Sequence, residues 1–210
     1  VSLLFQKGTP FIYQGQELGM TNCPFTSADY RDIQSVNQLE AARRKPFGKI
    51  VAHFTETYLQ RYARDNARTP MQWSDAANAG FTSGTPWMKI NENYREINAA
   101  AQLQDSNSVF RFYQKALALR KRYADVVRDG AFVPIGEQEK AVFAFARRLE
   151  GRQLLVVCSL SPKPVRFKIP AELCTGGAQL LLSNVDTPPV LAETIRLAPC
   201  ASMVWELCMD

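Results

Sequence analysis

The chain changes character after Asp129 and Gly130, and this change constrains its fold more than any other feature. From there on, short apolar segments alternate with turn residues at the spacing typical of strands in an antiparallel β-sandwich. We therefore expect this part to form an all-β domain. Its strands are predicted over residues 131–135, 142–147, 154–158, 165–169, 179–182, 194–197 and 203–207.

The part before this boundary mixes helical patterns with irregular segments. Apolar spacings of three and four residues predict helices, and Gly8, Pro10, Pro46 and Gly48 interrupt them. A polar stretch over residues 14–32 is too long for a simple connection and is expected to be a functional loop. The predicted elements are a helix end over residues 1–7, a short buried strand over 11–13, a helix over 33–45 capped by Asp32, a helix over 49–62, and a helix that Ser106 or Ser108 caps and that ends near Tyr123.

The composition excludes several classes of protein. With 46% hydrophobic and 21% charged residues among 210, the chain has the composition of an ordinary globular protein. No apolar run approaches the roughly 20 residues that span a bilayer, so no membrane helix is expected. The net charge of +5 comes from dispersed basic residues, and no nucleic-acid-binding motif accompanies them. We expect neither a membrane nor a nucleic-acid partner.

The use of cysteine and histidine argues against a metal site. The five cysteines show no Cys-x-x-Cys spacing, and His53 is the single histidine. A lone histidine beside an apolar helix face is more often structural than a ligand, so we expect no metal and no other cofactor. An odd, scattered set of thiols favours reduced cysteines in a cytoplasmic protein, although the sequence leaves open a bridge between two of the last four, which are Cys158, Cys174, Cys200 and Cys208.

The segment from Arg64 to Trp73, which reads RDNARTPMQW, follows neither a helical nor a strand period. Two arginines, an aspartate, two amides and an indole lie within it, and Pro70 drives Thr69 toward an extended backbone. Such donors and acceptors suit a ligand with many hydroxyl groups. Trp73 and the later Trp87 are more simply explained as a local core of this irregular region than as the lining of a sugar site.

Three phrases of the sequence together resemble one enzyme family. They are GTPFIYQGQELGM over residues 8–20, YRDI over residues 30–33, and the segment from Arg64 to Trp73. This spaced set closely resembles the α-glucosidases of the α-amylase superfamily, glycoside hydrolase family 13, especially oligo-1,6-glucosidases and their isomaltase, dextran glucosidase and sucrose isomerase relatives. Residues 79–81, 86–87 and 93–98 are similar to the same subfamily, so the resemblance covers the whole chain.

The resemblance implies an α/β part followed by an all-β part. Residues 1–127 would be the C-terminal part of a (β/α)8 TIM barrel, with its last strand, a loop insertion and its last helix. Residues 128–210 would be a C-terminal antiparallel β-sandwich domain. The chain begins at Val1 in an apolar stretch without a signal-peptide pattern, so we expect a C-terminal fragment of a longer enzyme.

The resemblance also implies that this chain recognises substrate and carries no catalytic residue. Family members hold their aspartate nucleophile, glutamate acid/base and stabilising aspartate on earlier strands. Arg64 falls on the family arginine that helps hold hydroxyls of the non-reducing glucosyl unit, a role that suits a planar guanidinium fork. The residues alone also allow Arg64 to tie the loop to Asp65 or another acid.

Two amides depart from the family pattern. Gln34 stands where relatives similar to oligo-1,6-glucosidase have a glutamate that contacts the leaving glucosyl side. Gln16 replaces the first acid of a Gln-Gly-Glu-Glu phrase, while Glu17 keeps the second. An amide in place of a carboxylate weakens charge-assisted hydrogen bonds, so the preferred linkage, and even hydrolysis over isomerisation, stays open.

The expected function is hydrolysis of α-glucosidic bonds in short oligosaccharides of the isomaltose or maltose type by a retaining mechanism, with this chain inactive by itself. One alternative is a sucrose or trehalose-forming isomerase on the same barrel. The other is a non-enzymatic carbohydrate-binding module, which would need exposed aromatic side chains on one sheet. The aromatic residues of the all-β part instead alternate like core residues: Phe132, Phe143, Phe145, Phe167 and Trp205.

Two further expectations concern the acids and the uncovered surfaces of the chain. The loop acids Glu17, Asp32, Asp65 and Asp75 are expected to be ionised partners of arginines rather than a catalytic pair. A barrel strand without parallel neighbours, and apolar residues 1–5, would be left uncovered, so we expect the chain to self-associate, or residues 1–60 to repack, when it is made alone. In the intact enzyme, the expected partner is an oligosaccharide substrate.

Overall fold

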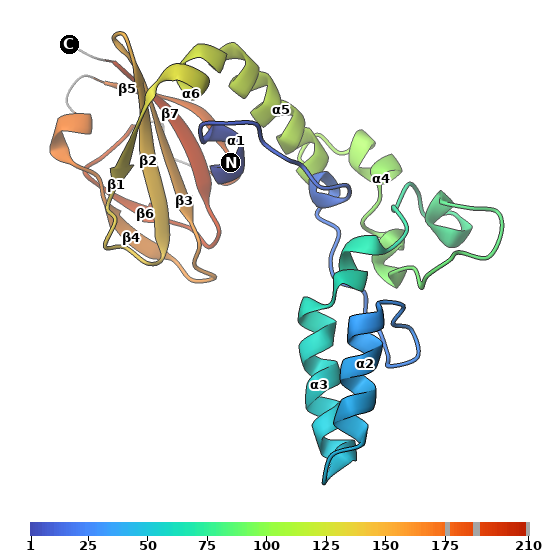
Figure 1. The fold of residues 1–210 in the computed structure, drawn as a ribbon. Helices are drawn as coiled ribbons and strands as arrows, with labels where there is room; N and C mark the ends of the chain where they lie inside the picture. Colours follow the sequence, from blue (N-terminus) through green and yellow to red (C-terminus); the bar gives the residue numbers. More distant parts are fainter. Residues whose placement is uncertain (175–176, 187–189, 209–210) are drawn as a thin grey trace. The chain divides into compact units, whose positions relative to one another are not determined.

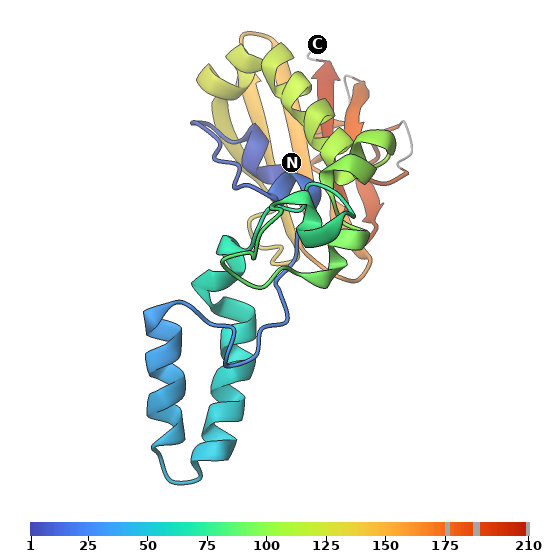
Figure 2. The same cartoon turned by 90° about the vertical axis from the view of Figure 1, so that its right-hand side faces the viewer.

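The computed structural model describes residues 1–174, 177–186 and 190–208, and the chain divides into two compact units (Figure 1, Figure 2). One unit combines Val1–Phe11 with Phe112–Asp210, and the other is Ile12–Arg111. We call them the sandwich unit and the insertion unit. The predicted division into 1–127 and 128–210 stays a prediction.

The sandwich unit contains the seven predicted strands, and they form two antiparallel sheets. Five pair in the order β1-β2-β3-β7-β5, and β4 pairs with β6. The observed bounds differ from the predicted ones by at most two residues at either end, so the predicted antiparallel β-sandwich is confirmed. The strands are β1 (Ala131–Ile135), β2 (Val142–Leu149), β3 (Arg152–Ser159), β4 (Val165–Lys168), β5 (Ala178–Ser183), β6 (Thr194–Leu197) and β7 (Ser202–Cys208).

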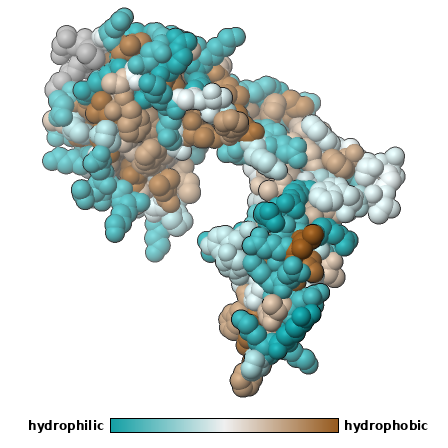
Figure 3. Space-filling view, in the orientation of Figure 1, coloured by the Kyte–Doolittle hydropathy of each residue, from teal (hydrophilic) through white to brown (hydrophobic). Residues whose placement is uncertain are grey.

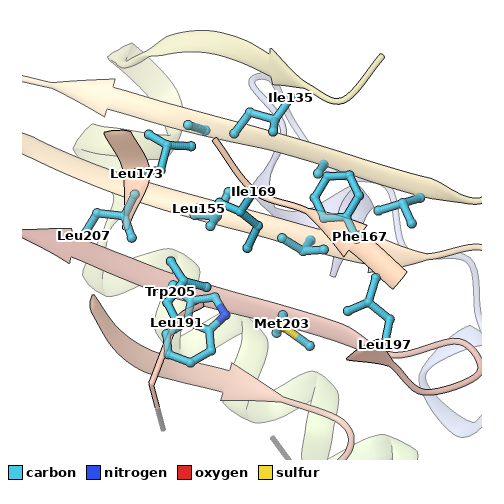
Figure 4. Close-up of a cluster of buried hydrophobic side chains, with 14 of the residues drawn as sticks. Ile135, Leu155, Phe167, Ile169, Leu173, Leu191, Leu197, Met203, Trp205 and Leu207 are labelled. Carbon is cyan, nitrogen blue, oxygen red and sulfur yellow. The ribbon is translucent and has the colours of Figure 1, made fainter. Parts of the chain in front are cut away.

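The core of the sandwich unit lies between its two sheets. Because side chains alternate across a strand, Leu155 of β3 and Trp205 of β7 point to one side of the larger sheet. There they meet Phe167 of β4, and Figure 4 shows these side chains in one cluster. All three are buried almost completely. This packing is the physical reason why the seven short segments fold as strands.

Not every aromatic residue expected in this core is buried. Phe145, Phe167 and Trp205 are buried and Phe143 is half-buried, whereas Phe132 is 44% exposed, so the expectation is wrong for Phe132. Phe132 lies on β1, at the edge of the sheet, and its ring stacks on Phe145 with the ring centroids 4.9 Å apart. Val133 and Ile135 on the same strand pack against the core cluster, so Phe132 points to the opposite face of the sheet, which leaves this ring partly open to solvent.

Two short helices contact the central strands of the larger sheet. Helix α1 (Ser2–Phe5) contacts β3, and α6 (Ala124–Asp129) contacts β2 and β3. Leu4 and Phe5 are buried, so the expectation that residues 1–5 lie uncovered is wrong for these two. The cause is that β3 is apolar on both faces: Leu154 and Val156 alternate with Leu155 and are buried too.

Two arginines fix the ends of these helices. The guanidinium of Arg120, on α5 (Val109–Arg122), donates hydrogen bonds to the carbonyl oxygens of Leu4, Gln6 and Gly8. Arg147 of β2 is fully buried, and its Nη2 donates to the carbonyl oxygens of Val127 and Gly130 at 2.8 and 2.6 Å. These bonds satisfy carbonyl groups that a helix end leaves without a partner.

The insertion unit is built around a helical hairpin. Helices α2 (Ile33–Arg43) and α3 (Gly48–Tyr62) lie side by side in both ribbon views and contact one another (Figure 1, Figure 2). Phe47, with a left-handed φ of 60°, turns the chain between them. Asp32 caps α2, as predicted, because its side chain accepts the backbone N–H of Ser35. Both predicted helices are therefore confirmed.

The rest of the insertion unit consists of short helical turns joined by irregular backbone. The side chain of Ser108 accepts the backbone N–H of Arg111, which identifies Ser108 as the cap of α5 that the sequence left open between Ser106 and Ser108. The turns are η1 (Gln16–Leu18), η2 (Arg64–Arg68), η3 (Ala77–Gly80), η4 (Glu92–Arg95) and α4 (Ala99–Gln104), while η5 (Ala171–Leu173) belongs to the sandwich unit.

Two expectations for the irregular regions are wrong. Residues 11–13 form no strand, and Phe11 is 84% exposed, because no segment in the described part of the chain pairs with them. Trp73 and Trp87 do not form a local core, since each side chain is about half exposed, at 52% and 55%. Asparagine and glutamine side chains hold these loops instead of aromatic packing.

The apolar face predicted for α3 is also largely open. Phe54, Tyr58 and Tyr62 are each more than half exposed, and in Figure 3 hydrophobic residues lie among hydrophilic ones along the hairpin. Within the described ranges, no helix has both the length and the apolar character that crossing a membrane requires.

Candidate functional site

The site begins at the first turn of α2. Asp32, the N-cap, has an extended backbone with φ of −67° and ψ of 119°, which turns its side chain back over the helix start. Its Oδ2 accepts both the backbone N–H and the hydroxyl of Ser35 at 3.2 Å. The side chain is only 6% exposed. The second oxygen, Oδ1, is thereby held in place and is available to another donor.

Arg64 supplies that donor from the far end of the hairpin. Helix α3 ends at Tyr62, Ala63 is extended, and η2 begins at Arg64. The Nη2 of Arg64 donates to Oδ1 of Asp32 at 2.6 Å, while its side chain stays 60% exposed. Arg64 therefore does tie the loop to an acid, and that acid is Asp32. Contact with a substrate stays a prediction for Arg64.

Asp65 and Arg68 complete the cluster. The Asp65 side chain is fully buried, and its Oδ2 accepts the backbone N–H groups of Arg31 and Asp32 at 2.8 and 2.9 Å. The Nη1 of Arg68 lies 3.6 Å from Oδ1 of Asp32 and 3.6 Å from Oδ1 of Asp65. Two arginines thus face two carboxylates, so the cluster is balanced in charge.

The cluster keeps Asp32 ionised. Burial alone would raise the pKa of Asp32, but the hydrogen bond from the Ser35 backbone and the charge and hydrogen bond of Arg64 outweigh it, so the pKa lies below its ordinary value. A carboxyl group with a lowered pKa cannot be the protonated acid that glycoside cleavage requires near neutral pH. The structure therefore supports the expected ion-pair role of this acid.

The other loop acids behave differently from Asp32 and Asp65. Asp75 is exposed, and Glu17 has a buried Oε2 without a hydrogen-bond partner in the described ranges. Neither forms an ion pair with an arginine within the described part of the chain, so the expected arginine partners are confirmed for Asp32 and Asp65 only.

The two amides that depart from the family pattern make different contacts. Gln34 is the second residue of α2, two positions after Asp32, and is exposed. The structure thus brings Gln34 and Arg64 to the same helix start, because Arg64 binds Asp32 there. Gln16 instead accepts the backbone N–H of Tyr13 through Oε1 at 3.3 Å. A substrate contact of Gln34 stays a prediction.

The turn η2 also borders a cleft of about 500 Å³ within the insertion unit. Tyr13, Tyr62, Asn66 and Thr69 are among its lining residues, so hydroxyl and amide groups face it. The Tyr13 hydroxyl donates to the carbonyl oxygen of Ala67 at 2.8 Å, which holds this side of the cleft against η2. Thr69 is extended, with φ of −60° and ψ of 148°, as expected before Pro70.

Metal-binding side chains do not gather in the described part of the chain. No group of three or more His, Cys, Asp and Glu side chains there could hold a metal ion. His53 is exposed on α3, with its ring beside Phe54, which agrees with a surface role. Cys23, Cys158, Cys174 and Cys200 carry free thiols, and the Cys208 side chain lies outside the described residues.

Sequence reasoning missed how Asp32 and Asp65 cooperate. It identified Asp32 as a helix cap and named both acids as arginine partners, but it gave neither a role in the site. The available signal was the repetition of one dipeptide, because Arg31-Asp32 and Arg64-Asp65 stand at the two ends of the hairpin. Only the fold shows that these two dipeptides meet.

Comparisons with known proteins agree on one family. The family model described as alpha amylase, catalytic domain, matches residues 1–130. An oligo-1,6-glucosidase of Parageobacillus thermoglucosidasius is 42% identical over 208 residues, which cover 98% of this chain and 36% of that protein. This chain thus spans about 36% of the length of that curated relative.

Solved structures show the same relationship. The crystal structure of trehalose-6-phosphate hydrolase from Bacillus licheniformis matches with a TM-score of 0.89 and 36% identity, over 99% of this chain and 37% of that one. An isomaltulose synthase variant from Erwinia rhapontici, solved with sucrose, matches with a TM-score of 0.89 and 35% identity, over 99% of this chain and 37% of that one. These matches confirm the expected fold class, the C-terminal part of a TIM barrel followed by a β-sheet domain.

Proposed function

Because this chain belongs to the α-amylase family, glycoside hydrolase family 13, we propose that it is part of an α-glucosidase that hydrolyses α-glucosidic bonds of short oligosaccharides. The substrates would be of the isomaltose or maltose type, and the mechanism would be retaining. Support comes from the oligo-1,6-glucosidase relative at 42% identity. The chain spans little more than a third of that relative, so the activity belongs to the longer enzyme.

One observation carries the role of this chain in that enzyme. Arg64 is tethered through Nη2 to a buried carboxylate at 2.6 Å, yet 60% of its side chain is exposed. A guanidinium held in this way keeps further N–H donors for vicinal hydroxyl groups of a sugar. We propose that Arg64 binds the non-reducing glucosyl unit and that Gln34, at the same helix start, faces the leaving side.

The acids of the cluster are not expected to break the bond. A retaining glycosidase needs one carboxylate as nucleophile and one protonated carboxyl group as acid, about 5 Å apart. Asp32 is ionised by its surroundings, and Asp65 has Oδ2 occupied by two backbone N–H groups. The proposal is therefore that this chain is inactive by itself and completes a site whose catalytic carboxylates lie in the longer enzyme.

The second candidate is a sucrose or trehalose-forming isomerase of the same family. The observation that favours it is the match to an isomaltulose synthase with a TM-score of 0.89, as high as that of the trehalose-6-phosphate hydrolase. The resemblance also implies that the neutral Gln34 stands where hydrolytic relatives have a glutamate, so the leaving side would lack that charge. A free-standing carbohydrate-binding module is not supported, because Phe145, Phe167 and Trp205 are buried.

Two further parts of the proposal concern the cellular compartment and the self-association of the chain. The free thiols of Cys23, Cys158, Cys174 and Cys200 support a reducing compartment, and we place the enzyme in the cytoplasm. The exposed aromatic side chains of α3 and the unpaired residues 11–13 support self-association of the isolated chain.

An assay of this chain beside the longest product of its gene tests the proposal. The longer product is expected to release p-nitrophenol from p-nitrophenyl α-glucoside and glucose from isomaltose, and the isolated chain is expected to release neither. Arg64→Ala should impair the longer product, whereas Arg44→Ala, at the exposed C-cap position just after α2, is the matched control. Turnover by the isolated chain contradicts the incomplete site, and conversion of sucrose into an isomeric disaccharide favours the second candidate.

A further inference from the structure

The two Arg-Asp dipeptides of the hairpin hold one another. Through Oδ2, Asp65 accepts the backbone N–H groups of Arg31 and Asp32 at 2.8 and 2.9 Å. Through Oδ1, Asp32 accepts Nη2 of Arg64 at 2.6 Å. These contacts close a ring, because a peptide bond joins Arg64 to Asp65. Each dipeptide therefore fixes a group of the other.

The two oxygens of Asp32 have separate partners. Oδ2 accepts the backbone N–H and the hydroxyl of Ser35, so the helix start sets the position of the carboxylate. Oδ1 is left for Arg64, with Nη1 of Arg68 at 3.6 Å. A carboxylate that is 6% exposed and bound on both oxygens is a rigid acceptor. A longer or unattached acid would not hold a guanidinium in one orientation.

Arg64 needs such an acceptor if it is to bind a ligand well. Fixing an exposed arginine side chain costs rotamer entropy, and an arginine that is already oriented avoids part of that cost when the ligand arrives. Within the described residues, Nη2 makes the one hydrogen bond of this side chain. Its Nε and Nη1 groups are therefore left for hydroxyl oxygens in the plane that Asp32 sets.

We propose that Asp32 is a positioning residue that orients Arg64 toward a glucosyl unit, and that Asp65 positions Asp32 through the backbone. This inference rests on the proposed function, because it requires Arg64 to contact substrate. Neither acid touches the sugar in this arrangement. Asp32 acts through the orientation of Arg64, and Asp65 acts through the position of the Asp32 backbone.

The test measures kcat and KM of the longest product of the gene with p-nitrophenyl α-glucoside. Asp32→Asn and Asp32→Ser both keep a good N-cap and remove the charge that holds Arg64, so kcat/KM should fall about tenfold to a hundredfold. Asp29→Asn is the matched control: this acid accepts the backbone N–H and hydroxyl of Thr26 and lies 3.6 Å from Lys89, away from Arg64. Its kcat/KM should change less than twofold, while Tm reports the structural cost of each variant.

A double variant separates positioning from a merely structural role. Because Asp32 acts through Arg64, Arg64→Ala and the Asp32→Asn, Arg64→Ala double variant should have the same kcat/KM. Additive losses, or normal activity of Asp32→Asn and Asp32→Ser beside an impaired Arg64→Ala, overturn the positioning role and leave the proposed function standing. Normal activity of Arg64→Ala overturns the proposed role of Arg64, and the positioning role with it. If Asp32→Asn does not fold, Asp32→Ser decides.

Discussion

Among the described residues, the sandwich unit buries fifteen apolar side chains in a cluster between its sheets, whereas a cluster in the insertion unit buries seven. In the sandwich unit, each strand is paired, and alternate side chains along a strand point into this cluster. In the insertion unit, Leu39 and Leu59 join the two hairpin helices to a small core, and most of the outer face of α3 is open. The same chain thus contains one region with a large core and one with a small core.

The insertion unit is held largely by side-chain amides. Nδ2 of Asn91 donates to the carbonyl oxygens of Thr21 and Asn22, and Nε2 of Gln72 donates to the carbonyl oxygen of Ile97 at 2.7 Å. Gln102 binds the carbonyl oxygen of Leu18 at 2.7 Å. These bonds join segments that are far apart in sequence and satisfy backbone that is in neither helix nor sheet.

This difference explains why the candidate site lies in the insertion unit. A sheet with both faces covered offers few free polar groups, because its backbone and side chains are occupied by packing. A loop region held by hydrogen bonds can keep polar side chains such as Arg64 at its surface in a defined position. The comparison predicts that apolar substitutions damage the sandwich unit most and polar substitutions damage the insertion unit most.

The largest effect is expected from Leu155→Ala in the sandwich core. Leu155 is completely buried, and its truncation leaves a cavity, so the free energy of unfolding should fall by about 3 to 4 kcal/mol. Phe54→Ala on α3, where the side chain is 68% exposed, should change it by no more than about 0.5 kcal/mol. Urea unfolding followed by circular dichroism measures both. Similar losses in the two variants would show that the α3 face is covered in solution.

The next effect is expected from Gln72→Ala in the insertion unit. Gln72 is fully buried, and its Nε2 donates to Oδ1 of Asn93 and to the carbonyl oxygen of Ile97. Removal leaves two part-buried acceptors without this donor, so the free energy of unfolding should fall by about 2 kcal/mol. Gln38→Ala on the exposed part of α2 is the control and should be close to neutral. The same urea experiment applies, and a neutral Gln72→Ala would refute the view that amides hold this unit.

Most of the sandwich unit was predictable from sequence because its interactions are periodic. Each strand is a short apolar segment bounded by turn residues, and Asp129-Gly130 marks the start of the pattern. The helices over residues 33–43 and 48–62 were predictable for the same reason, since Asp32 caps the first and Pro46 and Gly48 interrupt the pattern between them. Phe132 was mistaken for a core residue because both faces of this sheet carry apolar side chains, and alternation does not reveal which face packs against the second sheet.

The candidate site was predictable only as a set of residue types. Sequence resemblance singled out Arg64 and Gln34, but the partner of Arg64 is Asp32, which lies 32 residues away. No local pattern reveals such a pairing, because it depends on the length of the hairpin and on the direction in which α3 returns. Trp73 and Trp87 were assigned to a core because large aromatic residues are usually buried, and nothing local shows that amides replace them.

Thiol labelling offers a third comparison of the two units. Cys23 lies in the insertion core and Cys158 on β3, and burial raises both pKa values, that of Cys23 to about 11. Each thiol therefore reacts only when its unit opens. Because the insertion core is smaller, Cys23 should react with iodoacetamide at least about tenfold faster than Cys158. This ratio corresponds to a difference of about 1.4 kcal/mol in the free energy of opening of the two units. Mass spectrometry of labelled peptides resolves the sites, and exposed Cys200 gives the unprotected rate. Slower labelling of Cys23 would reverse the order of stability that we infer.

The smallest effect concerns acid. Because the pKa of Asp32 is lowered in the folded state, its stabilisation is complete above the ordinary carboxyl pKa of about 4 and is lost as the pH falls through the lower folded value. Hydrogen exchange at the Ser35 amide, corrected for its intrinsic rate, measures the free energy of protection. As the pH falls, this free energy should decrease by no more than about 1 kcal/mol, the usual size of an N-cap contribution. The protection of the Val156 amide in β3 should decrease less over the same pH range, because no carboxylate accepts this N–H. In Asp32→Asn the amide cannot titrate, so the acid-dependent loss at Ser35 should disappear. Its persistence in that variant would assign the acid sensitivity of the hairpin to another group.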